Sequence, residues 1–349
     1  MRIAVVCALL AALSCGPRRP EGPPPFYADK SDLMHVLDGE GGRRPVRTRA
    51  DWEVRRDHIR RNFMLVAGEA PPGRDLPLDV QVLEEKPLEK YARRAISFQT
   101  VDGDRVPALL LVPVELKGRA PAALCLHQTS ALGKREPAGE GNRNLAYAAE
   151  LAARGWVALA PDYPNFGDSK VDVYAQGYAS ATMKGIRNHR RAVDVLLSMP
   201  EVDGGRVAAI GHSLGGHNAI FAAVFDERIG TVVTSCGFNA FPKYYGGNLA
   251  GWGHKGYMPR IASAYGKDPA KMPFDFTELL GVLAPRRVFI NAPLRDANFE
   301  VSGVRDCVEA ARPVYALYGA ADSLLAVHPD AAHDFPPDIR EQAYKFMIK

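Results

Sequence analysis

The chain has 349 residues, of which 47% are hydrophobic and 24% are charged, and its formal net charge at pH 7 is +4. This length and composition suit one large folded domain with extensions. The small net charge and the lack of a basic stripe with interleaved aromatic residues exclude a nucleic-acid-binding class. After the N-terminus, no apolar run approaches the roughly 20 residues that a membrane span needs.

The N-terminus has the composition of a targeting segment. A basic start, the apolar stretch Ile3–Leu13 and small residues around Cys15 predict an export signal over residues 1–15. The four residues that end at Cys15 resemble a degenerate bacterial lipobox, with alanine where the pattern prefers leucine. Cys15 is therefore a candidate lipid attachment site, with plain signal cleavage as the alternative. The proline-rich stretch in residues 16–30 predicts an extended linker. We expect an exported protein that is periplasmic, membrane-anchored or secreted.

Hydrophobic periodicity then predicts a helical extension followed by an alternating α/β domain. Residues 31–90 form the extension, with a helix over 50–67, and residues 91–349 form the domain. The domain opens with an antiparallel hairpin over 91–114, broken at an Asp-Gly turn. Further strands are predicted at 122–126, 156–160, 207–210, 231–235, 287–290 and 323–327, with helices at 144–153, 186–199, 303–318 and 337–348. This alternation predicts a mostly parallel sheet flanked by helices, with functional residues at the carboxyl ends of the strands.

One segment interrupts the alternation. Residues 237–276 are rich in glycine and aromatic residues and follow a predicted sheet strand. A long loop at that place lies on the functional side of the sheet, so we expect a cap that helps to form a substrate pocket. The candidate pocket residues, from this segment and from two earlier loops, are His127, Tyr163, Phe238, Tyr245 and Trp252.

The most informative motif is the Gly-His-Ser-Leu-Gly sequence at 211–215. It lies between an apolar strand and a small, apolar helix, which is the context in which G-x-S-x-G forms a nucleophile elbow. The sharp turn projects the serine hydroxyl from the end of the strand, and the following helix directs its free N–H groups toward a developing oxyanion. Ser213 is therefore the predicted nucleophile.

A serine nucleophile needs a base and a carboxylate that orients the base. In this architecture they follow in the order Ser, acid, His. His333 lies in the loop after the last predicted strand, and Asp296 lies in the loop after the strand before it. Both loops fall at the carboxyl edge of the sheet. His328 is the alternative base, and Asp322 is the alternative acid.

The oxyanion needs two backbone N–H donors. Leu214, which directly follows the nucleophile, is the first candidate. The second is expected in the loop after the strand at 122–126. Gln128 is the candidate there, and Thr129 is the alternative.

These residues and motifs together resemble the α/β-hydrolase superfamily. Within it, residues 90–349 are most similar to the group of dienelactone hydrolases and acetyl xylan esterases. The resemblance implies a serine esterase that needs no cofactor. Dienelactone hydrolases use a cysteine nucleophile, and Ser213 stands at that position here, which favours ordinary ester cleavage. Secreted relatives often deacylate plant polysaccharides, so the resemblance implies a carbohydrate ester as the substrate.

Two other function classes remain open from the sequence. Prolyl oligopeptidase-type serine peptidases share this catalytic domain, but the residues before the sheet are too few for their propeller. A binding protein on a hydrolase fold is the second alternative. No metal site is expected, because Cys125, Cys236 and Cys307 lack metal-like spacing. Whether Cys236 and Cys307 form a disulfide stays open, as does the oligomeric state.

Overall fold

The computed structural model describes residues 22–38 and 41–348. The predicted signal segment, with Cys15, lies outside the described residues. Among the helices that are described, none is both long and apolar enough to cross a membrane.

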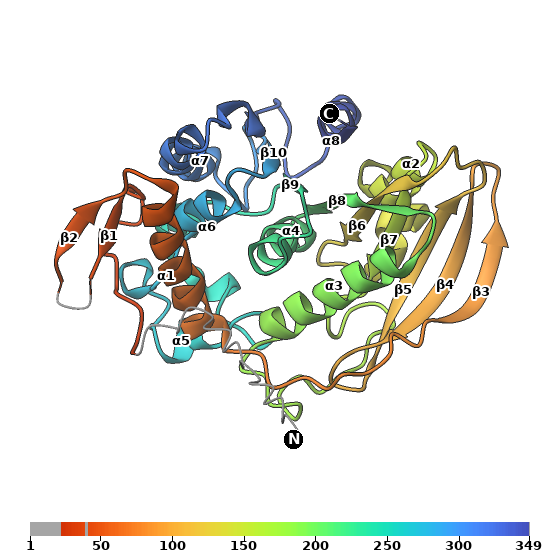
Figure 1. Ribbon diagram of the computed structural model, residues 1–349, viewed down its shortest axis with the longest axis horizontal. Coiled ribbons are helices and arrows are strands. Elements are labelled where there is room, and N and C mark those ends of the chain that lie inside the picture. The colour runs from red at the N-terminus through yellow and green to blue at the C-terminus, as the bar shows by residue number, and fades with distance from the viewer. Residues whose placement is uncertain (1–21, 39–40, 349) are drawn as a thin grey trace, which may run out of the picture.

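A mixed sheet of nine strands forms the centre of the molecule (Figure 1). In spatial order its strands are β11 (Leu324–Val327), β10 (Arg287–Asn291), β9 (Thr231–Ser235), β8 (Val202–His212), β6 (Ala120–Leu126), β7 (Val157–Pro161), β5 (Arg105–Pro113), β4 (Tyr91–Gln99) and β3 (Gln81–Pro87). Neighbouring strands from β11 to β7 are parallel, whereas β5, β4 and β3 pair antiparallel. The predicted α/β fold with antiparallel leading strands is confirmed. The loops that follow these six parallel strands therefore meet at one edge.

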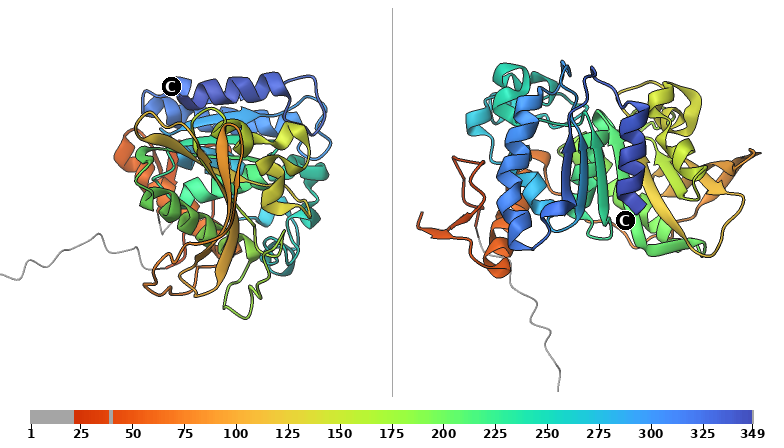
Figure 2. Two further views of the ribbon diagram at one scale, coloured as in Figure 1. Left: turned by 90° about the vertical axis from the view of Figure 1, so that its right-hand side faces the viewer. Right: turned by 90° about the horizontal axis from the view of Figure 1, so that it is seen from above.

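Helices cover both faces of this sheet and bury a separate apolar core on each. One core receives side chains from α1 (Arg49–Ala67), α3 (Ala181–Ser198), α4 (Leu214–Phe225), α6 (Phe276–Leu283) and α7 (Val301–Leu317). The other receives them from α2 (Tyr147–Ala152) and α8 (Pro337–Ile348). Figure 2 shows α7 and α8 on opposite sides of the strands. Helix α4, which follows the candidate nucleophile, is buried along almost its whole length.

Several elements differ from the sequence prediction. Strand β3 extends the sheet into the stretch predicted as a helical extension, and every one of its residues is exposed. Such an edge strand carries no alternation of buried and exposed residues that a pattern could reveal. The hairpin of β1 (His35–Leu37) and β2 (Arg43–Pro45) and helix α6 were not predicted either. The capping box of α6, made by Asp275 and Glu278, is the sequence signal that was missed.

The N-terminal helix α1 forms as predicted and packs on the domain. A capping box of Thr48 and Asp51 starts it. Trp52, Ile59 and Phe63 along one face are fully buried. Phe63 meets the aromatic rings of α4 and its surroundings, with its centroid 5.0 Å from that of Phe221. Helix α1 thus supports the helix that carries the candidate nucleophile.

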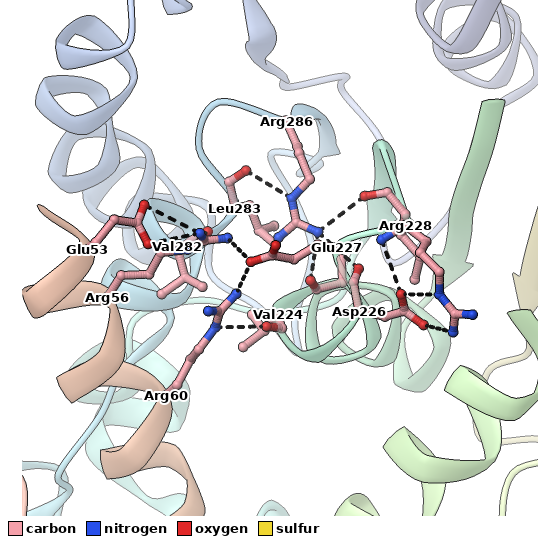
Figure 3. A network of polar contacts seen from close by, with 12 residues as sticks. Glu53, Arg56, Arg60, Val224, Asp226, Glu227, Arg228, Val282, Leu283 and Arg286 are labelled. Atoms are coloured by element: carbon pink, nitrogen blue, oxygen red, sulfur yellow. Dashed lines mark hydrogen bonds and ion pairs between the residues drawn. The ribbon is translucent and has the colours of Figure 1, made fainter. Parts of the chain in front are cut away.

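A polar network fixes the far end of α4 to its neighbours (Figure 3). Arg60 of α1 donates to the Val224 carbonyl at 3.0 Å and pairs with Glu227 at 2.9 Å. Arg286, in the turn before β10, donates to the Ala223 carbonyl at 2.7 Å. The last carbonyls of a helix have no partner within the helix, and cations there also complement its dipole. The network therefore orients α4 from its C-terminal end.

A buried ion pair joins α1 to α6, and its loss should strongly lower the stability of the fold. Nη2 of Arg55 lies 2.6 Å from Oε1 of Glu278, and both side chains are fully buried. Arg55→Ala leaves the Glu278 carboxyl buried without its cation, so we expect a loss of about 3–5 kcal/mol in the free energy of unfolding. Denaturant unfolding followed by circular dichroism measures this. Arg312→Ala, which breaks an exposed helical pair with Glu309, should cost less than about 1 kcal/mol. Equal stability of the two variants would contradict the prediction.

Candidate active site

Ser213 lies in a strained turn between β8 and α4. Its backbone has φ 54° and ψ −117°, a left-handed conformation that side chains rarely adopt and that costs about 1–3 kcal/mol. The Ser213 N–H donates to the Ser235 carbonyl at the end of β9, at 2.8 Å. This neighbouring strand holds the turn in place. The geometry is that of the predicted nucleophile elbow.

The glycines around Ser213 are required by close backbone approach. A Cβ on Gly215 would lie 1.8 Å from the Leu126 carbonyl oxygen at the end of β6, and one on Gly211 would lie 2.2 Å from the Gly215 carbonyl oxygen. Real Cβ atoms do not come so close to backbone. The first turn of α4 therefore packs directly on the ends of β6 and β8. This packing sharpens the turn at Ser213, which is partly exposed and lines a cavity.

The loops after β10 and β11 bring Asp296 and His333 together. Backbone hydrogen bonds join the two loops, among them Arg295 N–H to the Ala331 carbonyl at 3.0 Å and Leu294 N–H to the Pro329 carbonyl at 2.9 Å. His333 Nδ1 lies 2.9 Å and 3.0 Å from the two carboxylate oxygens of Asp296. The predicted acid and base thus form a hydrogen-bonded pair.

The pair also fixes the tautomer of His333. Burial raises the pKa of Asp296, but the hydrogen bond and charge of His333 and the N–H groups of Asn298 and Phe299 outweigh it, so the pKa is lowered overall. An ionised carboxylate only accepts hydrogen bonds. Nδ1 of His333 therefore carries the proton, and Nε2 keeps a lone pair. A histidine in this state can act as a general base.

The His333 ring packs beside the nucleophile turn. Its centroid lies 4.7 Å from that of His212, the residue before Ser213, and 6.0 Å from that of Phe299. Phe299 itself lines a cavity together with Ser213. The alternative base, His328, instead contacts the Ala292 carbonyl through Nδ1 at 2.9 Å.

Buried polar groups hold the His333 loop against β9 and β10. Asn291 Nδ2 donates to the Asp334 carbonyl at 2.9 Å and to the Ser235 hydroxyl at 2.8 Å. His212 Nδ1 contacts the same hydroxyl at 2.9 Å. Burial and the neighbouring His333 lower the pKa of His212 to about 3, so this ring is neutral and adds no positive charge beside His333.

The two candidate oxyanion donors come from the two segments that meet at Gly215, which are the first turn of α4 and the loop after β6. Leu214 is the first residue of α4, so its N–H has no carbonyl one turn earlier in the helix to bond. The side chain of Gln128 turns away and donates to Glu136 at 3.0 Å. Thr129 lines the cavity beside Ser213. The β6 loop thus offers the backbone of both predicted alternatives close to the nucleophile turn.

A cavity of about 210 Å³ opens at Ser213. Its wall is largely aromatic and contains no charged side chain among the residues that the structure describes. The lining residues are Thr129, Ser213, Leu214, His217, Tyr244, Gly251, Trp252, Tyr257, Asn298 and Phe299. Several of them come from the segment 237–276, as expected of a cap.

The sequence identified only one side chain of this wall from its five pocket candidates. Trp252 lines the cavity. Phe238 instead stacks on Phe276, with ring centroids 5.3 Å apart, and is buried. Tyr245 is exposed and reaches the site only indirectly, because its hydroxyl donates to the cavity residue Asn298.

The other two candidates, His127 and Tyr163, lie beneath the site. His127 is buried, and its Nε2 accepts from the Tyr163 N–H at 2.9 Å while Nδ1 contacts the Gln128 carbonyl at 2.7 Å. The Tyr163 hydroxyl donates to the Gly256 carbonyl at 3.2 Å. Their hydrogen bonds to backbone brace the β6 loop and the segment 237–276, and neither side chain lines the cavity at Ser213.

A larger cavity lies away from these residues. It measures about 950 Å³ and is formed by the segment 28–31, both ends of the segment 237–276, the start of α6 and α7. None of Ser213, Asp296 and His333 lines it. The smaller cavity is therefore the one that carries the candidate chemistry.

Three potential metal ligands come together behind Ser213. Donor atoms of His212, Cys236 and His333 lie within 4.8 Å of one another. Burial and the nearby Asp296 carboxylate raise the pKa of the Cys236 thiol well above its usual value, which disfavours the thiolate that binds metals. The hydrogen bonds already described occupy Nδ1 of both histidines. Within the described chain Cys125, Cys236 and Cys307 are free thiols, so the Cys236–Cys307 disulfide left open by the sequence is not formed.

The close contact at Gly215 predicts that adding a single methyl group there strongly lowers the stability of the fold. Gly215→Ala drives Cβ into the Leu126 carbonyl, so we expect a loss of at least about 3 kcal/mol in the free energy of unfolding. Gly205→Ala is the matched control on the same strand–helix unit, because its Cβ would meet no atom closer than 3.4 Å. Thermal unfolding compares the two variants. Similar melting temperatures would show that the turn tolerates a side chain at 215.

Buried histidines predict acid sensitivity. Burial holds the pKa of His189, His212 and His217 down to about 3. In the unfolded chain each titrates near 6.5, so the unfolded state binds more protons between these values. The stability they contribute is complete above pH 6.5 and is lost as the pH falls, by about 1.4 kcal/mol per pH unit for each histidine.

Unfolding free energies measured from pH 7 to pH 5 test this dependence. His189→Asn should reduce the slope of unfolding free energy against pH by the contribution of one histidine, about 1.4 kcal/mol per pH unit. His254→Asn, at an exposed position, should leave the slope closer to that of the parent protein. An unchanged slope in His189→Asn would contradict the assignment.

Known proteins agree with this architecture. A family model described as "Alpha/beta hydrolase family" matches residues 141–345. YtaP of Bacillus subtilis (strain 168), which is named as a hydrolase, is 25% identical over 305 residues that make up 83% of this chain and 98% of YtaP.

Solved structures of esterases share the fold at low sequence identity. The glucuronoyl esterase from Solibacter usitatus superposes with a TM-score of 0.74 at 20% identity, covering 93% of this chain and 98% of that chain. Acetyl xylan esterase 1 from Thermoanaerobacterium sp. JW/SL YS485 superposes with a TM-score of 0.55 at 18% identity, covering 79% and 89%. Because the family model spans more than half of the sequence, the chain belongs to the α/β-hydrolase family.

Proposed function

We propose that the chain is a serine carboxylic-ester hydrolase. Ser213 is the nucleophile, His333 the general base and acid, and Asp296 the group that orients His333. The observation that carries the proposal is the strained Ser213 turn at a cavity, with the His333–Asp296 pair packed against the residue before it. A serine, a histidine and a carboxylate in these relations form the arrangement used for acyl transfer.

The first half of the reaction forms an acyl-enzyme. Ser213 Oγ attacks the carbonyl carbon of the ester while His333 Nε2 takes the hydroxyl proton. The oxyanion accepts from the Leu214 N–H and from a second N–H of the β6 loop, Gln128 or Thr129, near the positive end of the α4 dipole. The intermediate then expels the alcohol, which leaves with the proton from His333.

The second half hydrolyses the acyl-enzyme. His333 takes a proton from water, the water oxygen attacks the acyl carbon, and Ser213 recovers its proton as the acid leaves. Throughout, Asp296 stabilises the imidazolium form of His333. Since His212 is neutral, the imidazolium forms beside a carboxylate and without a second cation.

The wall of the cavity supports an uncharged ester as the substrate. Its aromatic side chains suit stacking on a sugar ring or an aryl group, and charged groups are missing from its described lining. The names of the structural neighbours, glucuronoyl esterase and acetyl xylan esterase, point to carbohydrate esters. We therefore propose a neutral carbohydrate ester.

Removal of the nucleophile tests the proposal. Ser213→Ala should lower the hydrolysis of p-nitrophenyl acetate and of acetylated xylan by at least about 1,000-fold. A fluorophosphonate probe should label the parent protein but not this variant. Ser263→Ala, at an exposed serine of α5 (Arg260–Ser263), is the control and should keep both properties. Hydrolysis by Ser213→Ala at the parental rate would refute the assignment.

A further inference from the structure

Two buried polar atoms on the wall of the Ser213 cavity have no hydrogen-bond partner in the described chain. They are Nε2 of His217 and Nε1 of Trp252. Their rings contact each other edge to face, with centroids 4.7 Å apart. Buried polar groups without partners are uncommon, and each costs about 1–3 kcal/mol. Because their two rings contact each other beside the proposed nucleophile, this pair of atoms indicates a functional role.

The hydrogen bond on the other side of His217 decides what Nε2 can do. Nδ1 lies 3.1 Å from the Gly237 carbonyl oxygen, which only accepts. Nδ1 must therefore carry the proton, and Nε2 is left with a lone pair. Burial lowers the pKa of His217 to about 3, so the ring stays neutral. The cavity wall thus holds an acceptor at His217.

Trp252 supplies the complementary group. An indole N–H is a donor and never an acceptor. The ring is held by Tyr244 at 5.7 Å, Tyr257 at 6.1 Å and Phe299 at 6.2 Å between centroids. All three neighbours line the same cavity. A donor and an acceptor therefore lie on contacting rings in the aromatic part of the cavity wall.

A hydroxyl group is the simplest ligand group that satisfies both atoms. It donates one hydrogen bond and accepts others, whereas a carboxylate only accepts, an ammonium only donates and a methyl group does neither. His217 lies one turn after Ser213 on α4, and its N–H donates to the Ser213 carbonyl at 3.2 Å. The two orphan atoms therefore lie next to the reacting centre.

We propose that His217 and Trp252 bind a free hydroxyl of the substrate next to the scissile ester, with the hydroxyl donating to His217 Nε2 and accepting from Trp252 Nε1–H. The proposal rests on the proposed ester hydrolysis and specifies its substrate as a hydroxy ester, such as a sugar acylated beside a free hydroxyl. Both atoms are covered in the free protein. The Tyr257 ring contacts both side chains, and a small movement of the surrounding side chains must uncover the two atoms before the hydroxyl can bind.

Two acetates that differ by one hydroxyl group test the inference. They are trans-2-hydroxycyclohexyl acetate and cyclohexyl acetate. The parent protein should have a kcat/KM about 10–100-fold higher for the hydroxylated ester, as expected for one or two neutral hydrogen bonds. Equal values for the two esters would overturn the inference.

Two variants assign the preference to the two side chains. Trp252→Phe keeps a ring but removes the N–H. His217→Asn keeps a donor for the Gly237 carbonyl, but its shorter side chain has no acceptor at the position of Nε2. Each should lower the ratio of the two kcat/KM values to about 3-fold or less. Trp156→Phe, at a buried tryptophan on the other face of the sheet, should keep the parental ratio. A parental ratio in both site variants would show that other groups select the hydroxyl.

A binding measurement separates this inference from the proposed function. In Ser213→Ala, trans-cyclohexane-1,2-diol should shift the indole N–H resonance of Trp252, and cyclohexanol should not. Equal shifts would show that the wall recognises only the ring, which overturns the inference. Fluorophosphonate labelling of Ser213 reports independently on the nucleophile, so its failure counts against the proposed function alone.

Discussion

The close packing of the α4 first turn on the ends of β6 and β8 is the constraint on which the rest of the site depends. Gly211 and Gly215 let two backbones approach to distances that no Cβ would allow. The same packing forces Ser213 into its left-handed conformation and brings the free N–H groups of α4 to the β6 loop. The cost of the strained turn is offset by the burial of α4 between two layers of the molecule. Arginines at the opposite end of the helix complete its fixation.

Burial determines the charge states of the site residues as much as neighbouring charges do. Asp296 stays ionised because His333 and two backbone N–H groups outweigh its desolvation. His212 and His217, although they flank the nucleophile, are neutral because burial disfavours their charged forms. The site therefore has one fixed negative charge, on Asp296, which is not part of the cavity lining, and the described lining itself is uncharged. A neutral wall of this kind suits the uncharged esters proposed here.

Much of the fold was predictable, because strands and helices follow local hydrophobic periodicity. The strand Thr231–Ser235 was predicted with the bounds it has, and α1 and α7 differ by one or two residues at their starts. Strand β3 was missed because it is exposed on both faces, and α6 because it adjoins an irregular segment. The chain order of Ser213, Asp296 and His333 gave the candidate triad, since loops after parallel strands share one edge of the sheet. Most of the cavity lining was not predicted. The residues missed lie on irregular backbone, where no hydrophobic periodicity indicates the direction of a side chain; they are Tyr244, Tyr257, Asn298 and Phe299.

The sequence by itself determined the fold class, the nucleophile turn and the loops that carry the candidate acid and base, because each depends on local patterning or on chain order. Only the tertiary structure decided which side chains line the cavity and which hold it from below. His127 and Tyr163 brace the β6 loop, whereas His217 lines the cavity at Ser213. The tertiary structure also decided the protonation of the histidines. A tautomer is set by the partner that a ring nitrogen meets, such as the carboxylate of Asp296 or the carbonyl of Gly237, and those contacts join parts of the chain that only folding brings together.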